Sequence, residues 1–316
     1  MASKRPKHSI SKQSLADLER WHILNYFCFL FIPEDSFCSA CPKRGRNYWT
    51  IIKDLYNKIK QVYTNKTILK LYPMINTSEI APDVYRISVF VPEINLQFNH
   101  FLIKDEEPML YHAGLKQMFP LLLEAVSKII PPSQIRWIGF SHFEVDECGA
   151  LNDWLQVAPN AKAVCSEAGA IVNMNDFSIR PVHAMQDNMI LKTGKNSYRF
   201  IRTPHLPHGW DAGVMFEETN KTLLCSDLFH QNGDVVNLTD KDILGAHKSS
   251  MLEFEKGPLM AYTPYTHNTA KLLNSLAALQ PKTLATMHGS SFHGDCRTAL
   301  TDLNLVMKEI WGSEEN

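Results

Sequence analysis

The sequence predicts an α/β protein built as an αβ/βα four-layer sandwich, in which two sheets pack together and helices cover both outer faces. Segments typical of strands and of helices alternate along the chain, and they do so in two successive blocks on either side of a polar break. Neither an internal repeat nor a low-complexity linker separates the blocks. We therefore expect each block to supply one sheet of a single large domain.

In the first block, alternating or strongly apolar runs predict strands at 84–91, 98–104, 108–113, 135–140 and 162–166. Apolar side chains at helical spacing predict helices at 116–130, 150–155 and 166–174. In the second block, the same criteria predict strands at 198–203, 212–217, 221–227 and 283–287, and a helix at 265–279. The main domain is expected to cover residues 75–316.

The first 74 residues are expected to form a polar tail followed by a helical extension. Residues 1 to about 16 are polar, and 15–31 and 48–62 carry apolar side chains at helical spacing. Cys38 and Cys41 form an isolated CxxC motif, which is a weak signal for zinc because a structural zinc needs further ligands at defined spacing. Plain cysteines are the favoured interpretation.

The composition is that of a globular protein. Of 316 residues, 45% are hydrophobic and 21% are charged. The net charge of −1 argues against nucleic acid or a membrane surface as a partner, and no apolar run reaches the roughly 20 residues of a membrane span. Seven scattered cysteines and the lack of a secretory signal predict a cytoplasmic protein.

Four metal-capable side chains lie in the turn between the strand at 135–140 and the helix at 150–155, namely His142, Glu144, Asp146 and Glu147. In an extended stretch, alternate side chains point the same way. We therefore expect the first three to converge while Phe143 and Val145 face the core. Glu147, at the turn, can join them or swing away. Taken alone, the segment is equally well interpreted as an acidic loop beside an ordinary histidine.

Three later residues also follow predicted strands. His208 lies in the loop after 198–203, with His205 as an alternative three residues earlier. Asp227 ends an apolar strand, where a carboxylate is costly unless it is solvated, paired or bound to a cation. His288 follows the last strand. Among the other histidines, which show no such pattern, His230 and His293 are candidates only for supporting positions.

The candidate ligand set is therefore His142, Glu144, Asp146, Glu147, His208, Asp227 and His288. Seven ligands exceed what one metal needs, but with Asp227 as a bridge they fit two metals of about four protein ligands each. Such metals need open coordination positions to do chemistry. Four carboxylates against three imidazoles favour iron or manganese over zinc.

This pattern resembles the metallo-β-lactamase fold and, within it, the diiron domain of flavodiiron and oxygen-binding diiron proteins. The resemblance covers roughly 75–295, and Glu144 stands where hydrolytic members have a second histidine. It implies that one iron takes His142, Glu144 and His208, that the other takes Asp146, residue 147 and His288, and that Asp227 bridges. The flavodiiron pattern has histidine at 147. Either Glu147 replaces that ligand or the second metal is held more weakly.

The resemblance implies a protein that binds, senses or reduces O₂ or NO at two iron ions. Flavodiiron relatives continue into a flavodoxin domain, whereas this chain ends at Asn316 without a Gly-rich phosphate loop. We therefore expect no FMN in this chain and a separate electron-donor protein for sustained reduction. The sequence does not decide whether the protein forms a homodimer. The alternatives are a metal-dependent hydrolase of the same fold and a non-catalytic scaffold.

Overall fold

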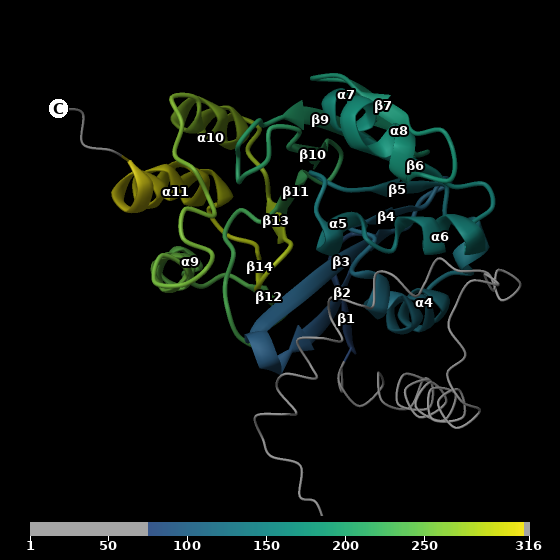
Figure 1. The fold of residues 1–316 in the computed structure, drawn as a ribbon, viewed down its shortest axis with the longest axis horizontal. Helices are drawn as coiled ribbons and strands as arrows, with labels where there is room; N and C mark the ends of the chain where they lie inside the picture. Colours follow the sequence, from purple (N-terminus) through teal and green to yellow (C-terminus); the bar gives the residue numbers. More distant parts are fainter. Residues whose placement is uncertain (1–74, 313–316) are drawn as a thin grey trace, which may run out of the picture. The chain divides into compact units, whose positions relative to one another are not determined.

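The structure, a computed structural model, describes residues 75–312 (Figure 1). The expected polar tail, the helical extension and the Cys38/Cys41 pair lie outside the described residues, so these expectations stay predictions. No helix in the part that is described is long and apolar enough to cross a membrane.

The first sheet is formed by the N-terminal half of the described chain. Its strands lie in sequence order, antiparallel from β1 to β4 and parallel from β4 to β7. They are β1 (Ile75–Ala81), β2 (Val84–Val91), β3 (Leu96–Ile103), β4 (Met109–Tyr111), β5 (Trp137–Gly139), β6 (Lys162–Ser166) and β7 (His183–Met185).

The second sheet has the order β12-β14-β13-β11-β10-β9-β8. In it, β11 runs parallel to β13 and β12 parallel to β14, and the other pairs are antiparallel. Its strands are β8 (Ile190–Lys192), β9 (Ser197–Arg202), β10 (Gly213–Glu217), β11 (Thr222–Ser226), β12 (Leu238–Thr239), β13 (Thr283–Thr286) and β14 (Ser291–Phe292).

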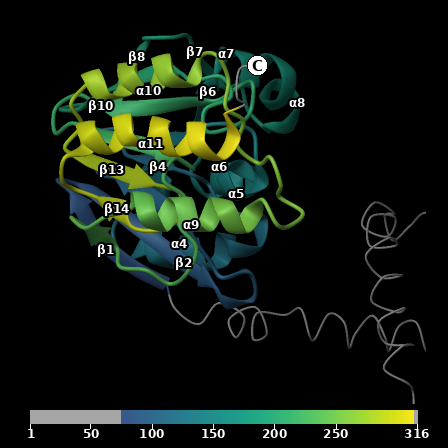
Figure 2. The same ribbon diagram turned by 90° about the vertical axis from the view of Figure 1, so that its left-hand side faces the viewer.

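Helices cover the outer faces of both sheets (Figures 1 and 2). Those that follow strands of the first sheet are α4 (Phe119–Ser127), α5 (Val145–Cys148), α6 (Leu151–Val157), α7 (Glu167–Gly169) and α8 (Asn175–Phe177). Those of the second half are α9 (Leu244–Phe254), α10 (Thr269–Ala278) and α11 (Cys296–Trp311), which Figure 2 shows side by side in the order α10, α11, α9. Short 3-10 turns lie at Pro92–Ile94, Lys116–Met118 and Pro132–Gln134.

Three apolar layers hold the four layers of secondary structure together. Alternation along the strands places successive side chains in different layers. In β3, Phe101 lies between the sheets while Leu102 packs under the first group of helices. In β11, Leu224 lies between the sheets while Leu223 packs under the second group. The predicted four-layer αβ/βα sandwich is therefore confirmed.

Individual elements differ from the sequence-based expectation in informative ways. The strands β2 and β6 have the predicted bounds. The helix expected at 166–174 is α7 followed by a π-helical segment, η4 (Ala170–Met174). The strand β1, the two- and three-residue strands β7, β8, β12 and β14, and the helices α9 and α11 were not predicted. Strands of two or three residues leave too little periodicity to recognise, and β1 is an edge strand with a single buried residue, Ile80.

Candidate metal centre

The acidic turn after β5 is only partly extended. Helix α5 begins at Val145, so Asp146 sits on a short helix rather than on an extended stretch. The exposed fractions of Phe143 and Val145 are 36% and 64%. The expectation that these two side chains face the core was therefore wrong. Because α5 turns the chain after Glu144, alternation no longer decides which way each side chain points.

The ends of β11 and β13 bring two distant residues to this turn. The strands are parallel, so their carboxyl ends lie at the same edge of the sheet. Asp227 directly follows β11, and His288 lies two residues after β13. Ser226, at the end of β11, has a φ of 55°, in the left-handed region that a non-glycine residue rarely adopts. This bend helps to direct Asp227 towards the acidic turn.

One group of donor atoms surrounds the Oδ2 atom of Asp227. The Nε2 atoms of His142 and His208 lie 3.7 Å and 3.4 Å from it. Both imidazoles also contact Glu144 Oε2, at 2.9 Å and 3.0 Å. One ligand atom from each of His142, Glu144, His208 and Asp227 lies within 4.8 Å of the others. This spacing fits a single metal ion among four donors.

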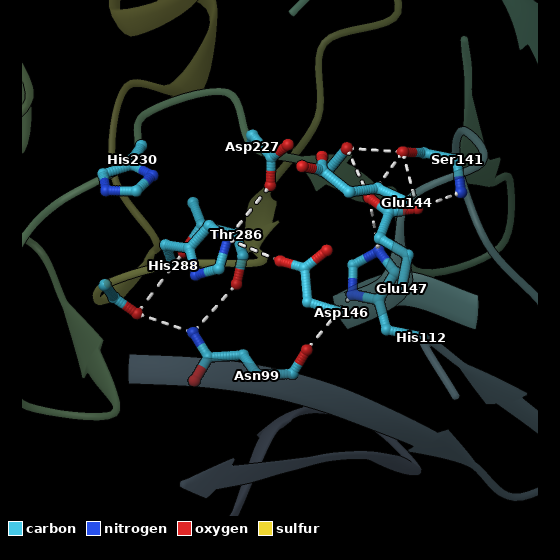
Figure 3. Close-up of polar contacts among 12 residues, drawn as sticks. Asn99, His112, Ser141, Glu144, Asp146, Glu147, Asp227, His230, Thr286 and His288 are labelled. Carbon is cyan, nitrogen blue, oxygen red and sulfur yellow. Dashed lines mark hydrogen bonds and ion pairs between the residues drawn. The ribbon is translucent and has the colours of Figure 1, made fainter. Parts of the chain in front are cut away.

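A second group lies on the other side of Asp227 (Figure 3). His288 Nε2 is 3.3 Å from Asp227 Oδ1 and 3.3 Å from Asp146 Oδ2. Neither contact has hydrogen-bond geometry, and Asp146 Oδ1 and Asp227 Oδ1 are buried without a hydrogen-bond partner. Asp227 thus presents one oxygen to each group, as a bridging carboxylate does.

The chemistry of the cluster fits metal ions. Among the described residues, the ion-pair partners of Glu144, Asp146 and Asp227 are all histidines, with no lysine or arginine. Asp227 is only 2% exposed on its side chain. Buried carboxylates without a fixed cation cost free energy. A bound metal ion would give the unpartnered carboxylate oxygens a partner.

Protonation shows how the cluster balances its charge without metal. Burial opposes protonation of His142, but the charges of Glu147 and Asp227 and the hydrogen bond to Glu144 outweigh it and raise its pKa to about 10. Burial is likewise outweighed at His288, whose pKa is raised to about 10 by Asp146 and Asp227. At Glu144, burial raises the pKa, but hydrogen bonds from two histidines dominate and lower it to about 2. The protonated imidazoles of His142 and His288 therefore supply the positive charge that balances the carboxylates.

Glu147 does not lie with either group of donor atoms (Figure 3). Its carboxylate is fully buried and accepts hydrogen bonds from the Ser141 N–H at 2.6 Å, the His142 N–H at 3.2 Å, and the hydroxyls of Ser141 and Ser226 at 2.7 Å and 2.8 Å. His112 Nε2 lies 3.6 Å from it. Of the alternatives that the sequence left open, this geometry favours the one in which Glu147 swings away. The side chain ties the acidic turn to the end of β11.

Residues that the sequence did not single out complete the surroundings. Tyr262 lies 4.3 Å from the His208 ring, centroid to centroid, and its hydroxyl donates a hydrogen bond of 3.3 Å to Asp227 Oδ2. No local pattern marks a tyrosine in a loop, and only the fold places it. In contrast, Ser226 could have been noticed because it directly precedes Asp227. His205, the alternative to His208, is exposed to solvent.

A cavity of about 490 Å³ opens beside the first group of donor atoms. His142, Glu144 and His208 lie on its wall, together with Phe143, Asn173, Gly209, Trp210, Asp211 and Tyr262. The cavity is open to solvent, so a small ligand can reach the first group without any rearrangement of the fold. The second group is more enclosed at its terminal carboxylate, since the Asp146 side chain is 14% exposed and that of Glu144 is 39% exposed.

Residues 96–289, more than half of the chain, match the sequence profile of the ODP family beta lactamase. The chain belongs to this family. Flavodiiron proteins are among the relatives of this ODP family chain. It is 27% identical over 227 residues to flavo-diiron protein FprA2 of Clostridium acetobutylicum, covering 67% of this chain and 56% of that protein. It is 24% identical over 207 residues to a nitric oxide reductase of Moorella thermoacetica, covering 63% of this chain and 50% of that protein.

Solved structures show the same fold. Rubredoxin oxygen:oxidoreductase from Desulfovibrio gigas matches with a TM-score of 0.63 at 20% identity, over 74% of this chain and 61% of that one. The flavodiiron protein from Giardia intestinalis matches with a TM-score of 0.62 at 20% identity, over 75% of this chain and 60% of that one. The fold is therefore the metallo-β-lactamase fold of flavodiiron proteins. The chain spans about half the length of the two curated relatives named above.

Proposed function

We propose that this chain holds two iron ions in the cluster around Asp227 and uses them to bind O₂ or NO, or to reduce these molecules with electrons from a separate donor protein. The observation that carries the proposal is the position of Asp227, whose two oxygens face two different groups of imidazole and carboxylate donors. The flavodiiron relatives and the nitric oxide reductase of Moorella thermoacetica support the same chemistry.

The residues would divide between two ions. His142, Glu144 and His208 would hold the first, Asp146 and His288 the second, and Asp227 would bridge. Carboxylate oxygens favour iron or manganese over zinc, which argues against the alternative of a zinc hydrolase. When bound, two ferrous ions supply electrons and open coordination positions for a diatomic molecule.

The protein itself would position the ligand and control protons. The cavity beside His208 gives access from solvent, and Phe143 and Trp210 lie on its wall. Burial, together with the charge of Asp227, raises the pKa of Tyr262 well above its usual value. The Tyr262 hydroxyl therefore keeps its proton at neutral pH and presents it to the site through its hydrogen bond to Asp227. The four described cysteines are buried free thiols, which supports the reducing cytoplasm as the location.

The test is anaerobic purification, loading with Fe²⁺, metal analysis, and an optical spectrum before and after exposure to O₂ or NO. We expect about two irons per chain and a spectral change with at least one of the two gases. Two irons without a change for either gas would contradict the proposal. Zinc with esterase turnover would support the hydrolase, and a chain that binds no metal would support the scaffold.

A matched pair of variants sharpens this test. His208→Gln removes a proposed ligand of the first iron and should lower the iron content to about one per chain. His205→Gln changes an exposed histidine three residues away in the same loop and should keep two. Equal iron contents for the two variants would contradict the assignment of His208.

A further inference from the structure

The two groups of donor atoms are unequal in number. The first offers two imidazoles, one terminal carboxylate and the bridging Asp227. The second offers only the His288 imidazole, Asp146 and Asp227. Glu147 does not fill the gap, because its carboxylate is engaged by backbone N–H groups and serine hydroxyls. A second metal with the same number of protein donors would need one more side chain.

His230 lies next to this gap (Figure 3). It follows Asp227 by three residues, its N–H donates to the Asp227 carbonyl oxygen at 3.1 Å, and it is only 2% exposed. Phe229, just before it, has a φ of 63°, in the left-handed region. This turn folds the chain back so that the His230 ring packs against the His288 ring, with centroids 4.7 Å apart.

The hydrogen bonds of His230 determine which ring nitrogen carries the proton. Its Nε2 lies 3.0 Å from Asn232 Oδ1. The Asn232 amide is oriented by its Nδ2, which donates to Glu253 Oε2 at 3.0 Å. Because an amide oxygen can only accept, Nε2 of His230 must be the donor. In the neutral ring, Nδ1 then carries a bare lone pair, and it is buried without any hydrogen-bond partner.

A histidine that binds a metal shows the same arrangement, with one nitrogen free for the ion and the other held by a hydrogen bond. His288 has it already, since its Nδ1 lies 2.7 Å from the Gln97 carbonyl oxygen and its Nε2 faces the carboxylates. His142 is similar, with Nδ1 held by the Ser141 hydroxyl at 2.8 Å. His230 offers Nδ1 instead of Nε2, and among the described residues this nitrogen has neither a hydrogen-bond partner nor a carboxylate at ion-pair distance.

The spacing of the rings agrees with a shared ion. Two imidazoles bound to one metal at about 2.1 Å, with an angle of about 90–110° between them, place their ring centroids about 4.5–5.3 Å apart. The His230 and His288 centroids are 4.7 Å apart. His142 and His208, the two imidazoles of the first group, have a similar separation of 4.3 Å.

We propose that His230 is a ligand of the second metal through Nδ1, together with His288, Asp146 and the bridging Asp227. This inference rests on the proposed two-iron function. It makes the two metal positions alike, each with two imidazoles, one terminal carboxylate and a share of Asp227. The imidazole that position 147 does not provide is then supplied from the segment after β11.

The test compares His230→Gln with His247→Gln in anaerobic titrations with Fe²⁺. His247 is a matched control because it is also buried, has an unpartnered ring nitrogen, and binds the His230 carbonyl oxygen through Nδ1 at 3.0 Å. Wild type and His247→Gln should bind two irons. His230→Gln should bind one iron as before and the second at least about 10-fold more weakly. Two irons with unchanged affinity in His230→Gln would overturn the proposal.

A crystal structure of the iron-loaded wild type decides the question even if the variant does not fold. We expect His230 Nδ1 within about 0.2 Å of 2.1 Å from the second metal. Two irons with His230 Nδ1 more than about 3 Å from both would overturn this inference and leave the proposed function intact. A wild type that binds no iron would overturn both.

Discussion

Replacing Glu147 by glutamine should destabilise the metal-free protein, because this carboxylate connects the acidic turn to β11. It accepts hydrogen bonds from the Ser141 N–H, the His142 N–H and the hydroxyls of Ser141 and Ser226. Hydrogen bonds to a charged group contribute about 1.5–3 kcal/mol each, against about 0.5–1.5 for neutral ones. Weakening four hydrogen bonds by about 1 kcal/mol each therefore suggests a loss of roughly 4 kcal/mol in the free energy of unfolding.

Removing one negative charge also relieves repulsion from the neighbouring carboxylates of Glu144, Asp146 and Asp227, which offsets part of this loss. It removes the attraction to protonated His142 as well, which limits the offset. We expect a net loss of about 2–4 kcal/mol in the free energy of unfolding. For a domain of this size, this corresponds to a melting temperature lower by roughly 5–10 °C. The assay is thermal unfolding of chelator-treated protein, followed by circular dichroism.

Asp146→Asn is the matched comparison, because it removes a carboxylate one residue away whose Oδ1 has no hydrogen bond. Asp146 Oδ1 is unpartnered, and Oδ2 meets only His288, which keeps Asp227 as a partner. Its metal-free unfolding free energy should change by no more than about 1 kcal/mol. If Glu147→Gln melts at or above the wild-type temperature, or no lower than Asp146→Asn, the connecting role of Glu147 is refuted.

Three further outcomes are expected. Asp227→Ala should lose both irons by metal analysis, and retention of two would exclude a bridge. In the metal-free protein, the pKa values of His142 and His288 are raised from the usual 6.5 to about 10. They contribute stability that is complete below about pH 6.5 and is lost as the pH rises through about 10. The free energy of unfolding in urea should therefore fall from pH 6.5 to 8 and to 10, and a rise would contradict this. Gly289→Ala should cost about 1–3 kcal/mol in urea unfolding, since φ is +95° there and a Cβ would lie 2.6 Å from Gln231 Cβ; an unchanged midpoint would refute this.

The sequence by itself determined the fold class and most of the candidate site. Strand periodicity is a local property, so β2 and β6 could be placed from it with their observed bounds. A polar residue directly after an apolar strand, such as Asp227 or His288, is likewise visible in the sequence. Because strand ends meet at one edge of a sheet, these positions predicted that distant residues would gather, and the structure brings His208, Asp227 and His288 to the acidic turn.

Only the tertiary structure decided which way individual side chains point. Glu147 turns away because Ser226, from the other sheet, helps to satisfy its carboxylate. His230 turns towards His288 because the left-handed backbone at Phe229 folds the segment back and Asn232, held by Glu253, orients the ring. Each of these directions depends on partners from other parts of the chain. Local spacing therefore located the candidate metal centre, whereas long-range packing separated the side chains that face it from those that support it.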